Sequence, residues 1–381
     1  MIASLRSEFL ARWTPAKYER LLAILAAECG APIPFRICET PCFLDAPLLA
    51  TLEQSGRELI EQLSTPSYRA ISEAAVPAEF RAPNEDPKPL FVQFDFGLVR
   101  EADGTIKPKL VEIQGFPSLY AFQPLLARAY IEAYDLDPAL APRFHRELLI
   151  DAIRGSHAPE NVVLLEIDPL HQKTHCDFVM TEKLTGVRPV CITQVKKRGR
   201  KLYYDRDIPI HRIYNRAIID EQIRRGIAAP FNWTDDLDVE WAGHPNYYFR
   251  ISKFSLPHLD HPTVPKTLFL DRIDKLPEDL SQWVLKPLYS FAGLGVVVGP
   301  TEGDIPKDRR DWILQERCDF TPLFETLDGV AKGEIRVMYI WLGDEPVAVS
   351  TIVRMGRGKM MGVDHNKGLN WVGASAALTQ A

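Results

Sequence analysis

The chain has 381 residues, of which 46% are hydrophobic and 25% are charged, as in an ordinary globular protein. Its net charge of -6 excludes a broad basic field for nucleic acid or an anionic membrane, and no run of about 18 apolar residues predicts a membrane span. Arg6, Glu8 and Arg12 interrupt the N-terminal segment, where a signal peptide would be apolar. We therefore expect a cytoplasmic protein with neither nucleic acid nor a membrane as a partner.

The six cysteines are scattered and form no CxxC pair, so neither a zinc site nor a disulfide framework is indicated. Cys38 and Cys42 are close enough in sequence to share a metal ion. Because no further Cys or His lies near them, two reduced structural thiols are the preferred interpretation.

The first 89 residues predict a helical segment. Apolar residues at three- and four-residue spacing indicate an amphipathic helix over 4–28, interrupted at Pro15 and ended by Gly30. A second helix is expected over 46–64, and both apolar faces are assigned to the core. Residues 77–89 are rich in proline and polar residues and predict a loop.

Two strands follow, over 90–99 and 109–120, with an Asp-Gly turn between them. Side chains two positions apart on a strand face the same side, so Asp95, Glu112 and Gln114 can converge on one face. Such oxygen ligands suit Mg²⁺, which takes one or two carboxylates together with substrate phosphates. The alternative is that Asp95 and Glu112 are surface groups of an edge strand, although their apolar neighbours indicate burial.

After a helix over 125–134 and a boundary at 155–160, strand, helix and strand patterns predict a small Rossmann-like βαβ layer. No GxGxxG follows its first strand, so the sequence gives no reason to expect NAD. Asn215 and Arg216 end a strand at the carboxyl edge of this layer, where ligands of α/β proteins bind, and are candidate substrate contacts. The basic run 196–201 is interpreted as a solvated hairpin in preference to a nucleic-acid patch.

A glycine-containing hairpin over 283–300 carries the clearest nucleotide signal. Its first strand ends in Lys286, and glycines in the following turn let backbone N–H groups approach an anion. Lys253 is expected just after a short upstream strand, and Gln315 and Glu316 end a strand over 311–317. Taken alone, a lysine beside a mobile hairpin is also a common structural feature.

The C-terminal part predicts an antiparallel pair over 334–339 and 347–354, with Arg336 on one strand and Arg354 at the end of the other. A tail rich in glycine, lysine and asparagine follows. Arginines at strand ends suit a phosphoryl-transfer site. The alternative is a surface sheet with ordinary Arg–Glu pairs.

The order of these motifs resembles the circularly permuted ATP-grasp ligases of the glutathionylspermidine synthase-like group. The resemblance covers about residues 88–381. It implies an α/β (α+β) fold: a circularly permuted ATP-grasp with an inserted Rossmann-like βαβ layer. The implied domains are an N-terminal helical segment (1–89), the permuted metal-binding part of the ATP-grasp body (90–154), the βαβ domain (155–250), the small lid subdomain (251–333) and the remainder of the body (334–381).

The resemblance also implies a site and an activity. The enzyme would join a carboxylate of a small molecule or peptide to an amine or thiol through an acyl-phosphate, releasing ADP and phosphate. The implied residues are Lys253, Lys286, Ser290, Gly293, Gly295, Gln315 and Glu316 for ATP, Asp95, Glu112 and Gln114 for Mg²⁺, Arg336 and Arg354 for the transferred group, and Asn215, Arg216, Arg357, Asn366 and Lys367 for substrate.

Two departures from the family keep alternatives open. Gln114 stands where the family has Asn, and Gln93 stands where relatives have a basic residue. A kinase or phosphotransferase of the same fold, or an ATP-binding protein without catalysis, are the alternatives.

Overall fold

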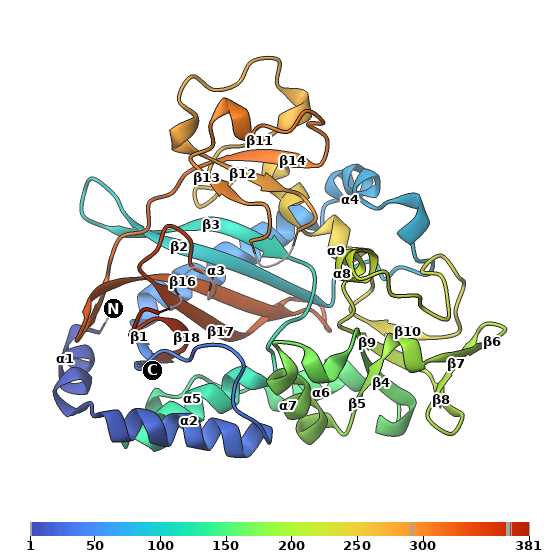
Figure 1. Cartoon of the computed structure of the whole chain (residues 1–381), viewed down its shortest axis with the longest axis horizontal. Coiled ribbons are helices and arrows are strands. Elements are labelled where there is room, and N and C mark those ends of the chain that lie inside the picture. The colour runs from blue at the N-terminus through green and yellow to red at the C-terminus, as the bar shows by residue number, and fades with distance from the viewer. Residues whose placement is uncertain (1, 291–292, 363–365, 367, 381) are drawn as a thin grey trace.

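The computed structural model describes residues 2–290, 293–362, 366 and 368–380, and it shows a mixed α/β molecule built around several sheets (Figure 1). Within these residues the large sheet has seven strands in the order β1-β18-β17-β16-β2-β3, with β15 also paired to β16. Only the β1–β18 pair is parallel. The strands are β1 (Cys42–Leu44), β2 (Phe91–Arg100), β3 (Ile106–Gln114), β15 (Phe324–Thr326), β16 (Gly329–Ile340), β17 (Val347–Gly356) and β18 (Gly373–Thr379).

Helices cover both faces of the large sheet. On one face α3 packs against β2 and β16, and on the other α5 packs against β17 and β18 with α2 outside it (Figure 1). The α-helices are α1 (Ala3–Arg12), α2 (Pro15–Cys29), α3 (Ala46–Leu63), α4 (Pro66–Ser72), α5 (Phe122–Tyr134), α6 (Arg146–Arg154), α7 (His175–Thr185), α8 (Ile219–Arg224) and α9 (Tyr247–Arg250).

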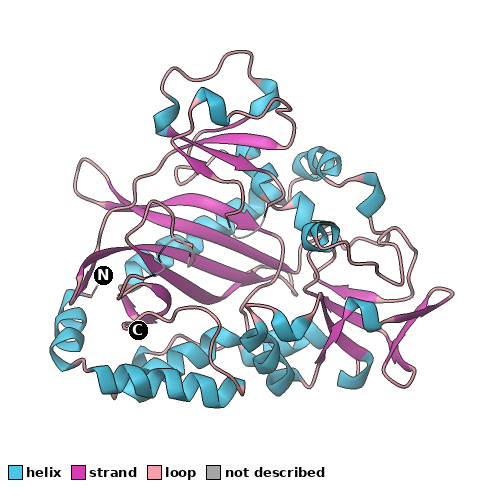
Figure 2. Cartoon of the chain, viewed as in Figure 1, coloured by secondary structure: helices cyan, strands magenta, loops and turns pink. Residues whose placement is uncertain are grey.

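A parallel sheet in the order β10-β9-β4-β5 lies beside the large sheet, with α6 and α7 near it (Figure 2). A separate three-stranded antiparallel sheet, β6-β7-β8, contains the basic run 196–201, whose charges pair with aspartates on neighbouring loops. These strands are β4 (Val162–Glu166), β5 (Arg188–Cys191), β6 (Lys196–Arg198), β7 (Lys201–Tyr204), β8 (Ile208–Ile210), β9 (Arg212–Asn215) and β10 (Glu240–Ala242).

A small antiparallel sheet in the order β11-β14-β12-β13 stands over the β3 edge of the large sheet (Figure 1). Backbone and side-chain hydrogen bonds join the two: the Leu110 N–H donates to the Thr263 carbonyl (2.7 Å), and Gln315 Nε2 donates to the Leu110 carbonyl (3.2 Å). The strands of the small sheet are β11 (Thr267–Phe269), β12 (Trp283–Pro287), β13 (Val297–Val298) and β14 (Trp312–Glu316).

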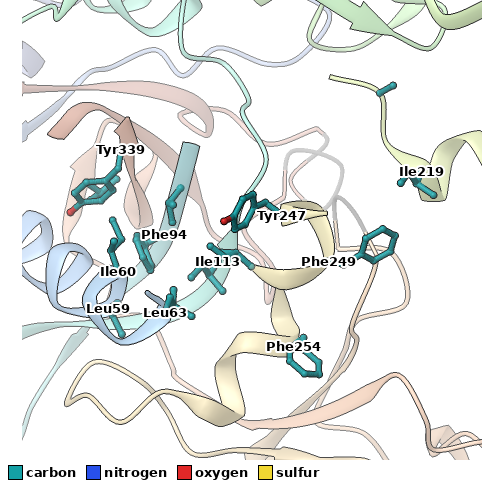
Figure 3. Close-up of a cluster of buried hydrophobic side chains, with 14 of the residues drawn as sticks. Leu59, Ile60, Leu63, Phe94, Ile113, Ile219, Tyr247, Phe249, Phe254 and Tyr339 are labelled. Atoms are coloured by element: carbon teal, nitrogen blue, oxygen red, sulfur yellow. The ribbon is translucent and has the colours of Figure 1, made fainter. Parts of the chain in front are cut away.

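The main hydrophobic core continues from the large sheet toward the small sheet. Figure 3 shows Leu59, Ile60 and Leu63 of α3 beside Phe94 of β2 and Ile113 of β3. The same cluster includes Tyr247, Phe249 and Phe254 in the segment that leads to β11. The hairpin β2–β3, which carries the predicted carboxylates, therefore packs against α3.

Several expected elements are confirmed. The first helix is interrupted at Pro15, and Gly30 ends it with φ 70°, a conformation that glycine adopts without a Cβ penalty. The helix over 46–64, the β2–β3 hairpin, the strands of the βαβ layer and the Lys286 hairpin are also present.

Other expectations are wrong. Lys253 does not follow a strand: the preceding residues form α9, and Lys253 begins a 3-10 helix, Lys253–His258. β1, β18 and α6 were not predicted. β1 has only three residues, too few to show a periodic pattern, whereas the spacing of Leu149, Ala152 and Ile153 is the signal that could have predicted α6.

The six cysteines are all free thiols. Cys38 and Cys42 are fully buried, and both lie against the Met355 sulfur, at 3.7 and 3.4 Å. This matches the expected structural thiols. In the described part of the chain, no helix combines the length and the apolar character that crossing a membrane requires.

Candidate functional site

The candidate site lies where β3 meets the small sheet. The β2–β3 register places Asp95 opposite Glu112 and Gln93 opposite Gln114, with a bulge just after Asp95. The neighbouring strand β16 places Arg336 opposite Asp95. The pairing of strands from distant parts of the chain therefore brings the predicted carboxylates and an arginine together.

Asp95 serves as the counter-ion of two arginines. Arg336 donates to both of its carboxylate oxygens, from Nε to Oδ1 (2.5 Å) and from Nη2 to Oδ2 (2.7 Å), and Arg354 also donates to Oδ2. Burial by itself would raise the pKa of Asp95, but the charges of Arg336 and Arg354 outweigh it and lower the pKa to about 2. Glu334 is the second acid of this cluster and pairs with Arg354.

Asp95, which was predicted as a metal ligand, is engaged by arginines in this structure. Its oxygens accept three hydrogen bonds from guanidinium groups, one at Oδ1 and two at Oδ2. Among the described residues, no group of three or more His, Cys, Asp or Glu side chains is arranged to hold a metal ion.

The two predicted phosphate-binding lysines both point at β3. Lys253 Nζ lies 3.0 Å from Glu112 Oε1 and donates to the Ser290 carbonyl (2.8 Å). Lys286 Nζ donates to the Val111 carbonyl (2.8 Å) and to Gln315 Oε1 (2.5 Å). Both lysines are about 95% buried.

Burial and these contacts shift the pKa values of Lys286 and Glu112. Burial lowers the pKa of Lys286 to about 8, and the nearby Glu112 charge only partly offsets it. Burial would raise the pKa of Glu112, but Lys253 outweighs that effect and the pKa is lowered. At neutral pH the Glu112 carboxylate and the Lys286 ammonium group are therefore both charged.

A small cleft lies between the end of β3, the segment over 248–253 and the residues that follow β12. Its volume of about 20 Å³ is enough for one or two water molecules. A nucleotide would therefore need the cleft to open. It is lined by Glu112, Ile113, Gln114, Gly115, Phe116, Tyr248, Ile251, Ser252, Lys253, Leu288, Tyr289 and Ser290.

Two polar atoms at this cleft are buried without a hydrogen-bond partner: Gln114 Oε1 and Ser290 Oγ. An amide oxygen in this state is costly, because its lost hydration is not replaced. At the same cleft as the Glu112 carboxylate, it matches the hard oxygen donors that Mg²⁺ prefers, so Glu112 and Gln114 fit a metal.

The remaining predicted nucleotide residues belong to β14 of the small sheet and to the turn between β12 and β13. Gly293 and Gly295 have φ of 75° and 76°, and a Cβ at Gly295 would approach the Pro287 ring at 3.1 Å, so this turn requires glycine. Gln315 is turned inward between Lys286 and β3. The Glu316 side chain is exposed, and its backbone N–H donates to the Lys266 carbonyl.

The predicted substrate residues Asn215 and Arg216 lie at the carboxyl end of β9, next to the same cleft. Arg216 stacks between Phe116 and Phe178, with its guanidinium carbon 5.3 Å from each ring centre. Asn215 Oδ1 is buried without a partner. Because Phe116 also lines the cleft, the structure links this pair of residues to the Glu112 region.

The tail residues do not join this group. Asn366 holds its own loop together, accepting from the backbone of Arg357 and Gly358 and donating to the Met360 and Gly362 carbonyls. Arg357 donates to Thr326 Oγ1 and to the Asn370 carbonyl of the tail. Lys367 lies outside the described residues.

One residue of interest was missed. Glu166 ends β4 next to Arg216, and burial raises its pKa to about 8 despite the arginine charge. The signal that selected Asn215, a polar residue at the carboxyl end of a buried parallel strand, also applies to Glu166.

Comparisons with known proteins bear on the fold alone. No protein-family model and no curated protein matches the chain. A solved structure, described as a glutathione synthetase-like effector (GSS30) from Globodera pallida in its apo form, matches 97% of this chain and 98% of its own with a TM-score of 0.59. The two sequences are 12% identical. This likeness shows that the chain shares the fold of the glutathione synthetase-like effector.

Proposed function

We propose that the chain is an ATP-dependent ligase of the ATP-grasp type, which joins a carboxylate to an amine or thiol. The observation that carries the proposal is that Lys253, Glu112 and Gln114 line one cleft, while Lys286 binds the Val111 carbonyl of the same strand, β3. Two buried cations facing hard oxygen donors suit a metal-bound triphosphate. The overall likeness to a glutathione synthetase-like structure supports the same class.

In this proposal Lys253 and Lys286 neutralise the ATP phosphates, and Glu112 and Gln114 hold Mg²⁺. Bound there, the metal would supply charge compensation for the phosphates. The glycine-containing turn with Ser290, Gly293 and Gly295 would cover the phosphates, and the Gln315–Glu316 strand end would adjoin the nucleoside.

Arg336 and Arg354 would stabilise the transferred group. Asp95 and Glu334 hold the two guanidinium groups in fixed positions, so little reorganisation is needed during the reaction. Arg354 keeps 26% of its side chain exposed, so it is the arginine that a substrate reaches more easily.

The reaction would proceed in two displacements. A substrate carboxylate oxygen attacks the γ-phosphorus and ADP leaves, which gives an acyl-phosphate. An amine or thiol then attacks the acyl carbon and inorganic phosphate leaves. Catalysis consists of positioning and electrostatic stabilisation, without a protein nucleophile. Asn215 and Arg216 are the proposed contacts of the substrate, a small molecule or peptide.

The topology is compatible with circular permutation. Strands β2 and β3 complete a sheet with β16, β17 and β18, which come more than two hundred residues later, and the parallel sheet and small sheet lie between them in sequence. We propose that the permuted arrangement and the inserted βαβ layer explain this order.

Gln93 favours a second candidate, an ATP-binding protein without ligase activity. Its amide donates to the Phe116 carbonyl (2.5 Å) and accepts from Arg336 (3.2 Å), so both ends are engaged within the protein. Because the Gln93 amide is neutral and bonded within the protein, it does not supply the positive charge that the basic residue provides in the related ligases.

The first prediction concerns Lys286. Lys286→Met keeps most of the side-chain volume but removes the charge, and we expect ATP turnover to fall at least about a hundredfold, as when a transition-state donor is removed. ADP release is measured across amino acids, peptides and polyamines with Mg·ATP, and hydroxylamine traps any acyl-phosphate as a hydroxamate.

The matched control is Lys307→Ala, an exposed lysine of the same small sheet region, which should retain full turnover. Full turnover in Lys286→Met would overturn the assignment. ADP release without hydroxamate would indicate a kinase, and Mg·ATP binding without ADP release would favour the inactive binding protein.

A further inference from the structure

We propose that Cys38, Cys42 and Met355 form a binding site for a soft monovalent metal ion, Cu(I). The inference goes beyond the proposed function, since no step of the ligase reaction uses these three residues. On β17, Met355 follows Arg354, and neighbouring residues of a strand face opposite sides of the sheet. The sulfur cluster therefore lies on the other face of the sheet from the Arg354 side chain.

Three sulfur atoms converge in the core beside β1. Met355 Sδ lies 3.7 Å from Cys38 Sγ and 3.4 Å from Cys42 Sγ. Both cysteines are free thiols and fully buried, and Met355 is 1% exposed. Two sulfur ligands that lie about 2.3 Å from one metal ion are roughly 3.8–4.0 Å apart. The sulfur atoms would therefore separate by about half an ångström or less to admit an ion between them.

The ligand types favour Cu(I) over Zn²⁺. Thiolate and thioether sulfur atoms are soft ligands, and the combination of Cys and Met selects Cu(I). A structural zinc site takes four ligands from Cys, His, Asp or Glu. Among the described residues, no third member of that group joins Cys38 and Cys42 in such a set. The third ligand that the structure supplies is the neutral thioether of Met355.

The charge beside the cluster also matches a monovalent ion. The Arg6 side chain is buried near Cys42 and donates to two neutral acceptors, Thr40 Oγ1 and the Pro41 carbonyl (2.9 Å). Its Nε is buried without a hydrogen-bond partner. Two thiolates and Cu(I) together carry one net negative charge, which the guanidinium would neutralise. A divalent ion would form a neutral complex and would not offset the charge of Arg6.

Binding of the ion needs no oxidant or reductant. Each thiol loses its proton as its sulfur binds, so one Cu(I) ion enters, two protons leave, and no atom changes oxidation state. An entry route lies at the sheet edge, because β1 has three residues and pairs with β18 alone in the large sheet. Local opening of this short edge strand would expose Cys42.

The test is an anaerobic titration of the reduced full chain with Cu(I) in competition with a chromogenic chelator, bicinchoninate. We expect the parent protein to withdraw one Cu(I) ion per chain from the chelator. Met355→Leu keeps a similar side-chain volume and removes one ligand, so we expect the affinity to fall at least about tenfold. Cys38→Ala/Cys42→Ala should abolish the competition. Cys176→Ala removes a buried thiol elsewhere and should keep the parent affinity.

Several outcomes would overturn the proposal. These are a parent protein that withdraws no Cu(I), a Met355→Leu variant with unchanged affinity, and tighter binding of Zn²⁺ than of Cu(I) in the parent. Competition that persists in Cys38→Ala/Cys42→Ala would place the ion on other thiols, such as the less buried Cys191 and Cys318. If the double variant does not fold, the comparison of Met355→Leu with the parent still decides. ATP turnover enters none of these measurements, so the proposed function is tested separately.

Discussion

At the scale of single residues, Asp95 shows how the structure neutralises a buried charge. A carboxylate between two phenylalanines on a buried strand was expected to hold a metal, yet the structure surrounds it with Arg336 and Arg354. The residue is 2% exposed, so its charge needs a partner, and two guanidinium groups supply it. The acid that remains available at the cleft is Glu112.

Asp95→Asn should strongly destabilise the protein. It keeps the side-chain shape but leaves two largely buried arginines with one carboxylate fewer, and we expect a loss of about 3–5 kcal/mol in the free energy of unfolding. Urea denaturation at neutral pH measures the loss. The exposed Asp274→Asn is the control and should change the unfolding free energy by less than about 0.5 kcal/mol.

The same residue predicts an acid dependence. The folded-state pKa of Asp95 is lowered to about 2, so its contribution to stability is present above its unfolded pKa of about 4 and is lost as the pH falls toward 2. The difference in stability between parent and Asp95→Asn should therefore narrow over that range. A difference that stays constant down to pH 2 would contradict this account.

At the scale of elements, α3 is positioned by a close approach to the sheet. Gly56 lies against the Tyr339 ring, whose hydroxyl donates to the Glu53 carbonyl of the same helix (2.6 Å), and a Cβ at Gly56 would overlap the ring. A glycine within a helix is usually unfavourable, so its presence here reflects the packing distance between α3 and β16.

Gly56→Ala should therefore destabilise the protein even though alanine is the better helix former. Overpacking costs about 1–3 kcal/mol, which exceeds the propensity gain of about 1 kcal/mol in most of that range. Thermal unfolding should show a lower melting temperature. Gly343→Ala, in a turn where an added Cβ meets no atom within 4 Å, is the control, and a rise in stability for Gly56→Ala would show that the helix can move away.

At the scale of the whole molecule, the candidate site is formed between two sheets. The β3 edge belongs to the large sheet, and Lys286 and Gln315 come from the small sheet. Lys253, on the segment before β11, adds the third contact. If the cleft opens by a movement of the small sheet away from β3, the contacts of Lys253, Lys286 and Gln315 with β3 must break together.

Binding of Mg·ATP should slow hydrogen exchange on both sides of this boundary. We expect protection in β3 and in β12 and β14, by up to about a hundredfold at saturating nucleotide, and none in β4 and β9 of the parallel sheet. Lys286→Met should lose this protection. Protection confined to β4 and β9 would place the nucleotide at the parallel sheet instead.

The sequence by itself determined the local elements and the residue types of the site. Proline and glycine ended the first helix, alternation defined β2 and β3, and the Lys286 hairpin and the carboxyl ends of the parallel strands were visible because their signals lie within a few residues of one another. Glu112, Gln114 and Lys286 were selected in this way, whereas Lys253 was expected after a strand that the structure does not form. Glu112, Gln114 and Lys253 line one cleft, and Lys286 contacts the Val111 carbonyl of the same strand.

Only the tertiary structure decided how those charges pair. Asp95 and Arg336 are 241 positions apart, and Lys253 and Glu112 are 141 positions apart, so no local pattern states which cation neutralises which acid. A buried charge takes whichever opposite charge the folded backbone places within reach. In the folded chain Asp95 therefore pairs with arginines, and Asn366 accepts a hydrogen bond within its own loop. Gln114 Oε1 remains at the cleft without a hydrogen-bond partner.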